Sequence, residues 1–329
     1  MLDGVSFLPA QGGESLVPSA KVFEVVGHGG LVEMYGLLRR RPDLTEVLDA
    51  DGFTPLLLAV SKGKMELAQL LAQAGGDIHA RDRDGWESLH HACANGHYDT
   101  AQWLLEAGAS VKSKSNDGWQ PMHAAADNGE LPVAKLLRDK RRADLRAVTD
   151  DHQAPIHLAA GSGHHEFCQW LVRSTDGDCL AAQDALGWRA VHHAASTGEL
   201  QMLRWLHSLS QKFPAASVQA PTSEGWQPIH FAANGGHLEM VEWLLAHSSE
   251  INAPTSDGWQ PLHIAAHAGH EHVARWLLEH GSLPHAATIE GYEASDLAAS
   301  AGHAQLGAWL QATLTKLPER QGSLRGKAP

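Results

Sequence analysis

The chain is short of cysteine and of long apolar runs, and each shortage excludes a class of protein. Its 329 residues include only three cysteines, Cys93, Cys168 and Cys179, without paired spacing. We therefore expect no secreted disulfide framework, and a reducing compartment, the cytoplasm or the nucleus, fits better. No apolar run approaches the roughly 20 residues that span a bilayer. The N-terminal stretch also lacks the basic and apolar regions of a signal peptide.

Basic residues are outnumbered as well. Lys and Arg number 25 against 38 Asp and Glu, so the formal net charge is −13. Nucleic-acid binding needs clustered cations, so this balance disfavours nucleic acid and is compatible with a basic protein partner. Short basic runs at 39–41 and 140–142 are interpreted as solvated turns. The P-loop, GxGxxG, GxSxG and HExxH signatures are all missing, so an enzyme is the least favoured function and no cofactor is expected.

What the chain does have is an internal repeat. Eight repeats can be counted from a turn that is usually Asp-Gly or Glu-Gly, at 51–83, 84–116, 117–150, 151–185, 186–223, 224–256, 257–289 and 290–314. Each has Ala at position 9 and Gly at position 13. A small residue lets helices approach closely, and a Gly after a helix supplies the left-handed conformation. Pro at position 5 in five repeats favours the start of one helix, and later apolar spacing predicts a second.

The stretch DGWQPLHIAAHAGHEHVARWLLEHG, residues 257–281, resembles the ankyrin repeat. This resemblance covers about residues 20–314 and implies an all-α ankyrin-repeat solenoid. Each helix–turn–helix unit would project a β-hairpin finger, and the fingers and first helices would line a concave groove. Residues 20–50 resemble an N-terminal capping half-repeat, and the polar repeat 290–314 resembles a C-terminal cap. We expect disorder in residues 1–19 and in the basic tail 315–329.

The 23 histidines invite a metal hypothesis, but the repeat accounts for many of them. Those at position 7 are His90, His123, His157, His192, His230 and His263, and the resemblance makes them structural hydrogen-bonding residues. Another five follow the position-13 Gly: His97, His164, His237, His270 and His303. The remaining clusters, around Cys168 and His272, lack ligand spacing, so we predict no metal site. The family's capping Thr survives only as Thr54, and we expect its replacements Gln227 and Gln260 to hydrogen-bond to each other.

All eleven tryptophans fall on two positions of the repeat. Those at position 20 are Trp103, Trp170, Trp205, Trp243, Trp276 and Trp309, and their periodicity predicts core packing between second helices. The position-3 aromatics lie in the fingers and are Phe53, Trp86, Trp119, Trp188, Trp226, Trp259 and Tyr292; only Gln153 interrupts them. The resemblance places position 3 on the concave face. These aromatics either pack on one another or form a binding surface, and the two interpretations are compatible.

Position 1 adds a row of carboxylates beside the finger aromatics. Its members are Asp51, Asp84, Asp117, Asp151, Glu224, Asp257 and Glu290, with Leu186 as the exception. Part of this row is turn chemistry, because Asp before Gly favours a turn. Carboxylates next to aromatic rings also favour a cationic ligand. The sequence therefore predicts a non-enzymatic module that binds a basic or extended protein segment. The alternative is a structural or targeting subunit of a larger assembly.

Overall fold

The computed structural model describes residues 19–314, which belong to two compact units. The N-terminal unit ends at Ala185 and the C-terminal unit begins at Leu186, which is also the boundary between the fourth and fifth repeats. The tails expected to be disordered lie outside the described residues, except for Ser19, which begins the first helix.

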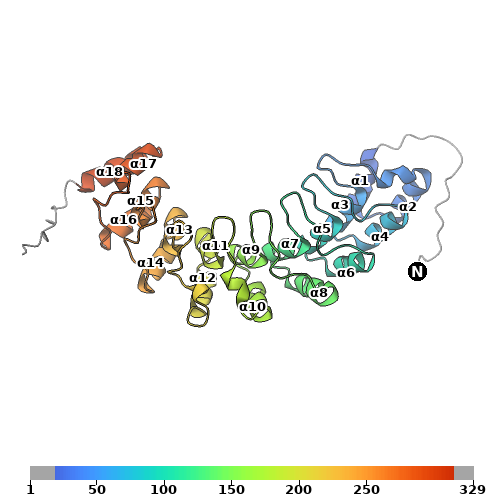
Figure 1. Cartoon of the computed structure of the whole chain (residues 1–329). Coiled ribbons are helices and arrows are strands. Elements are labelled where there is room, and N and C mark those ends of the chain that lie inside the picture. The colour runs from blue at the N-terminus through green and yellow to red at the C-terminus, as the bar shows by residue number, and fades with distance from the viewer. Residues whose placement is uncertain (1–18, 315–329) are drawn as a thin grey trace, which may run out of the picture. The chain divides into compact units, whose positions relative to one another are not determined.

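Paired helices build the N-terminal unit, with the first helix of each repeat in one row and the second in another (Figure 1). The capping half-repeat consists of α1 (Ser19–His28), α2 (Leu31–Arg40) and the 3-10 turn η1 (Pro42–Thr45). The first helices are α3 (Pro55–Ser61), α5 (Ser88–Ala94), α7 (Pro121–Asp127) and α9 (Pro155–Gly161). The second helices are α4 (Met65–Gln73), α6 (Tyr98–Glu106), α8 (Leu131–Arg141) and α10 (His165–Ser174), followed by η2 (Asp178–Ala181).

The C-terminal unit follows the same plan. Its first helices are α11 (Ala190–Thr197), α13 (Pro228–Asn234), α15 (Pro261–His267) and α17 (Ala294–Ser300). Its second helices are α12 (Leu200–Ser208), α14 (Leu238–Ala246), α16 (Glu271–Glu279) and α18 (Ala304–Leu314), and η3 (Pro214–Ala216) follows α12. The all-α fold of paired, sequentially stacked helices is thus confirmed.

Small residues set how closely the first helices pack. In both units each first helix contacts the next, from α3 through α9 and from α11 through α17. The position-9 alanines, Ala59, Ala92, Ala125, Ala159, Ala194, Ala232, Ala265 and Ala298, are all fully buried. A larger side chain there would push neighbouring helices apart, which explains why the position is constant.

The position-13 glycine is required for two reasons, which Gly236 illustrates. Its φ is +71°, a conformation that a side chain disfavours. A Cβ at Gly236 would also lie 2.6 Å from Nδ1 of His270, the residue that follows Gly in the next repeat. The sequence indicates the helix-ending role of this glycine, but the close approach of the next repeat is visible only in the structure.

The long repeats differ from the others after their second helices. We expected loops at 173–183 and 208–221, and these segments contain the 3-10 turns η2 and η3. In the third repeat, α8 is lengthened to Arg141, and its C-cap residue Arg142 has a φ of +52°. The fingers are hydrogen-bonded turns rather than hairpins with long ladders. One isolated antiparallel bridge, between Ala287 and Glu293, is found in residues 19–314.

Candidate binding surface on the fingers

The backbone of six of the seven finger aromatics is fixed by the residue four positions earlier. The N–H of Trp226 donates to Oγ1 of Thr222 at 3.1 Å, and the N–H of Thr222 donates back to the Trp226 carbonyl at 2.8 Å. Equivalent side-chain acceptors precede five other finger aromatics, which we call rungs, and these acceptors are Asp49, Asp82, Ser115, Thr255 and Thr288. Thr149 accepts in the same way from the N–H of Gln153, the residue that interrupts the aromatic series. The alternation of Asp, Ser and Thr at this position was a signal that our sequence analysis missed.

Adjacent fingers are also tied to one another. The carbonyl of position 1 accepts a hydrogen bond from the last residue before the next repeat, as in Asn116 N–H to Asp84 (2.9 Å) and Ser256 N–H to Glu224 (2.9 Å). The backbone of the acidic row is therefore held in place, while its side chains remain exposed. A surface built on such fixed turns is preorganised, which reduces the ordering cost of binding.

The position-7 histidines brace each finger against the next one, as the resemblance implied. The ring of His230 accepts a hydrogen bond at Nδ1 from the Gln227 N–H (2.9 Å), and its Nε2 faces the Ala253 carbonyl at 2.8 Å. This pattern recurs at His90, His123, His157, His192 and His263. With an acceptor required at Nδ1 and a donor at Nε2, each ring is the neutral Nε2–H tautomer.

Burial lowers the pKa of four of these histidines and so favours their uncharged form. Loss of hydration lowers the pKa of His230 to about 4, because the charged ring would lie among apolar neighbours. Burial likewise lowers the pKa of His90 to about 4 and lowers the pKa of His123 and His263. The bracing of the fingers is therefore intact at neutral pH and weakens as the rings become protonated.

In the N-terminal unit, the finger aromatics are half-buried and contact one another. The ring centroids of Trp86 and Trp119 are 6.1 Å apart. Phe53 and Trp86 are bridged by His91, whose ring lies 4.9 Å and 5.3 Å from theirs. His91 Nε2 is in turn 2.8 Å from the Asp82 carboxylate, beneath Trp86. These three rungs thus pack side by side while part of each ring stays accessible.

In the C-terminal unit, the aromatic surface contains a cavity. Phe231 lies between two rungs, with ring centroids 4.3 Å from Trp188 and 5.3 Å from Trp226. Leu186, Glu224 and Asn234 complete the lining of a cavity of about 190 Å³. Its walls are apolar, and Glu224, at its edge, is exposed. Further along, Trp259 is half-buried against His267, and Tyr292 is exposed.

The side chain at position 8 determines how neighbouring finger aromatics contact each other, and the sequence analysis did not identify this role. His91 and Phe231 both occupy this position, and each inserts between two finger aromatics. In the third repeat the same position is Ala124, and there Trp86 and Trp119 meet directly. Position 8 was not noticed because its importance depends on the spacing between repeats rather than on any pattern within one.

The seven carboxylates of the acidic row are all exposed. None of them makes an ion pair within residues 19–314. They are therefore available to a cation in solution. Two of them, Asp84 and Glu224, lie next to finger aromatics described above, so charge and aromatic surface are adjacent in each unit.

The second-helix tryptophans are not the core residues that we predicted. All six are half-buried, whereas Leu70 and Leu136 at the same position are 5% and 4% exposed. The Trp276 ring stacks on His280 at 3.7 Å, and the Arg275 guanidinium lies over Trp309 at 4.1 Å. The apolar stripe centres on positions 17, 18 and 21, so position 20 lies at its edge and an indole extends beyond it.

The predicted bond between two glutamines, the histidines after the position-13 Gly and the metal-ligand clusters involve the remaining polar residues. The predicted hydrogen bond between Gln227 and Gln260 is absent from the described residues, and Oε1 of Gln260 is buried without a partner. His164 and His270 form inter-repeat bonds, with Nε2 2.8 Å from the carbonyls of Asp127 and Asn234. Within residues 19–314, no group of three or more His, Cys, Asp or Glu could hold a metal ion.

Comparison with known proteins identifies the family. A family model described as "Ankyrin repeats (3 copies)" matches overlapping windows that together extend from residue 26 to residue 311. The chain therefore belongs to the ankyrin repeat family, whose repeats generally mediate protein–protein interaction and are typically non-catalytic. The human "Ankyrin repeat domain-containing protein 37" is 36% identical over 72 residues, which is 22% of this chain and 44% of that protein. The match thus spans less than half of that relative.

No helix among residues 19–314 has the length and apolarity needed to span a bilayer. Ankyrin repeats imply a protein partner, and the surface formed by the finger aromatics and the acidic row is the candidate site for it.

Proposed function

We propose that this chain is an interaction module that binds a basic, extended protein segment with its finger aromatics and acidic row. The observation that carries the proposal is the cavity between Trp188 and Trp226. It combines apolar walls with the exposed carboxylate of Glu224. A Lys or Arg side chain has the matching chemistry, because its apolar stem can lie against the rings while its charge meets the carboxylate.

The arrangement of the fingers supports the same proposal. Because the turn backbones are fixed by hydrogen bonds, the rings and carboxylates present a regular series along each unit. An extended segment could place successive basic side chains against successive rungs. Partly packed rings favour this role, since aromatic hot-spot residues act best when their neighbours hold them rigid.

The proposal can be tested by selecting random peptides from a displayed library with the full chain as bait. We expect the peptides that bind to be enriched in Lys and Arg with apolar residues beside them. Glu224→Gln removes one charge without changing the shape of the cavity, and Trp226→Ala removes one wall. Binding of the selected peptides should weaken in both variants. Selected peptides that lack basic residues and bind both variants as tightly as the native chain would contradict the proposal.

The alternative function is a structural or targeting subunit of an assembly. In that case, affinity purification should recover a stoichiometric complex that survives high salt, because large apolar interfaces are insensitive to screening. A complex that dissociates in high salt and competes with the selected basic peptides supports the groove-binding proposal instead. Nothing in the finger geometry favours the assembly function over the binding function.

A further inference from the structure

A second surface, at the ends of two second helices of the N-terminal unit, is rich in basic residues. The segment 135–146, KLLRDKRRADLR, contains six basic and two acidic residues in a chain whose net charge is −13. The short basic run 140–142 within it was interpreted above as a solvated turn. The structure instead places residues of this segment around a cavity of about 540 Å³ in the N-terminal unit.

The cavity lies where two repeats depart from the usual length. It is lined by residues in and just after the last turns of α8 in the third repeat and α10 in the fourth, and these repeats have 34 and 35 residues. Arg142 and Asp176, at the two helix ends, both have left-handed φ angles of +52° and +50°. The extra residues therefore turn the chain out of the regular repeat and open a concave surface beside the second helices.

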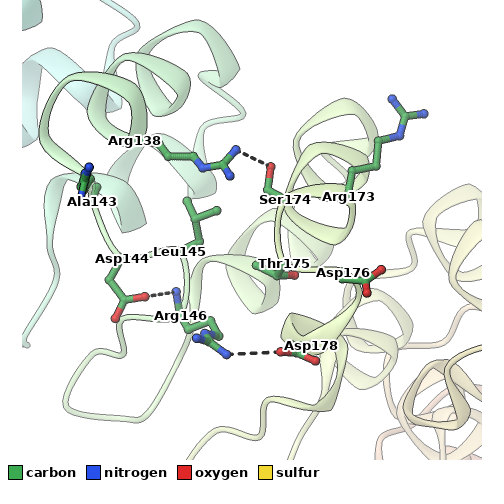
Figure 2. A pocket seen from close by; sticks show the side chains of 11 residues that line it. Arg138, Ala143, Asp144, Leu145, Arg146, Arg173, Ser174, Thr175, Asp176 and Asp178 are labelled. Carbon is green, nitrogen blue, oxygen red and sulfur yellow. Dashed lines mark hydrogen bonds and ion pairs between the residues drawn. The ribbon is translucent and has the colours of Figure 1, made fainter.

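Four arginines line this cavity, and the guanidinium groups of two of them make no hydrogen bond or ion pair with the described residues 19–314. Arg138 donates from Nη1 to Oγ of Ser174 at 2.9 Å, and Arg146 Nη1 lies 3.4 Å from an Asp178 carboxylate oxygen (Figure 2). The guanidinium groups of Arg142 and Arg173 are exposed and make no hydrogen bond or ion pair within residues 19–314. A guanidinium offers several donors in a fixed plane, which suits a carboxylate.

We infer that this cavity, lined by Arg138, Arg142, Arg146 and Arg173, docks an acidic segment of a protein partner. Four arginines against three aspartates leave the lining with a net positive charge, which is complementary to an acidic segment, and a cavity of this size is in the range of ligand-binding sites. Figure 2 shows that the side chains of Arg138, Arg146 and Arg173 extend from different elements and do not converge on one point. Such spacing suits several carboxylates along an extended chain better than a single phosphate. The lining also contains Asp144, Asp176 and Asp178, whose charges disfavour a compact dianion more than carboxylates that are spread along a chain.

The inference does not rest on the proposed function, because it involves different residues and a ligand of opposite charge. It can be tested with a labelled glutamate-rich peptide, using fluorescence polarisation at low and high salt. The variant carries Arg142→Asn and Arg173→Gln, since Asn tolerates the left-handed φ of Arg142. The matched control carries Arg39→Gln and Arg40→Gln, which remove two exposed arginines from the end of α2.

We expect the glutamate-rich peptide to bind the native chain and the control equally, and to bind the double variant about 5-fold to 10-fold more weakly. Its glutamine counterpart should not bind, and added salt should weaken the native complex. The inference is overturned if the double variant binds as well as the control, or if the peptide does not bind at all. Displacement by inorganic phosphate, or binding only of a phosphoserine peptide, would also overturn it in favour of a phosphate site. Circular dichroism of the variants confirms that they are folded.

Discussion

Lowering the pH should destabilise the fingers, because each position-7 histidine must be neutral to make the two hydrogen bonds that brace them. His230 gives the cleanest case: burial lowers its pKa from 6.5 to about 4, and its only opposing influence is the hydrogen bond to Ala253. A histidine whose folded pKa is below its unfolded value stabilises the fold fully above pH 6.5. That contribution is lost as the pH falls from 6.5 toward 4, since the unfolded chain takes up the proton first.

The expected loss of stability follows from the pKa values of His230 in the folded and unfolded chain. Between pH 7.5 and pH 5, a group with a pKa of 6.5 unfolded and about 4 folded reduces the free energy of unfolding by about 2 kcal/mol. His90, in the N-terminal unit, has the same folded pKa of about 4 and should lose a similar amount. A loss of about 2 kcal/mol is a substantial fraction of a typical domain stability of about 5–15 kcal/mol.

The assay is equilibrium urea unfolding at pH 7.5 and pH 5, followed by circular dichroism, for the native chain and His230→Asn. Asn can still accept the Gln227 N–H but leaves the Ala253 carbonyl without its donor, so stability at pH 7.5 should fall by about 1–3 kcal/mol. The further loss on going to pH 5 should be smaller than in the native chain by about 2 kcal/mol. As a control, His267→Asn removes an exposed histidine from the same unit. An unchanged acid loss in His230→Asn would refute the reasoning.

Three further predictions concern the repeat framework. Gly236→Ala should lower the free energy of unfolding by more than about 1 kcal/mol, because φ is positive and the new Cβ meets His270; a neutral effect in urea unfolding would contradict this. Thr255→Ala removes the acceptor for the Trp259 N–H and should cost about 1 kcal/mol in the same assay, whereas Thr255→Ser should restore most of it. All three cysteines are buried, and burial raises the pKa of each thiol. A thiol reagent at pH 8 should therefore label them only after denaturation, and rapid labelling of the native chain would be inconsistent with the structure.

Much of the fold could be predicted because the sequence contains eight copies of the same structural unit. The constant alanine and glycine have local causes, close helix packing and a left-handed helix end, and both are seen at Ala232 and Gly236. The role of His230 followed from the family resemblance, and its two hydrogen bonds agree with it. Local conformation and helix periodicity are properties of a single repeat, so the sequence is enough to predict them.

Properties that depend on neighbouring repeats could not be predicted in this way. Helix periodicity predicts the direction in which the Trp276 side chain points but not how deeply it is buried. The indole is too large to be covered at the edge of the apolar stripe. The insertion of Phe231 between two rungs depends on the distance between repeats. The cavity lined by Arg142 and Arg173 depends on the path of the chain after two irregular helix ends, which no repeat pattern specifies.

We propose that the finger aromatics, rather than the second-helix tryptophans, bind the partner. The most direct test compares Trp226→Ala with Trp243→Ala, the same substitution at two half-buried positions of one repeat. The quantity to measure is the Kd of a selected basic peptide by isothermal titration calorimetry, at a temperature where both variants are folded. The account predicts a loss of at least about 10-fold for Trp226→Ala and an unchanged Kd for Trp243→Ala. Equal effects of the two substitutions, or none from either, would contradict it.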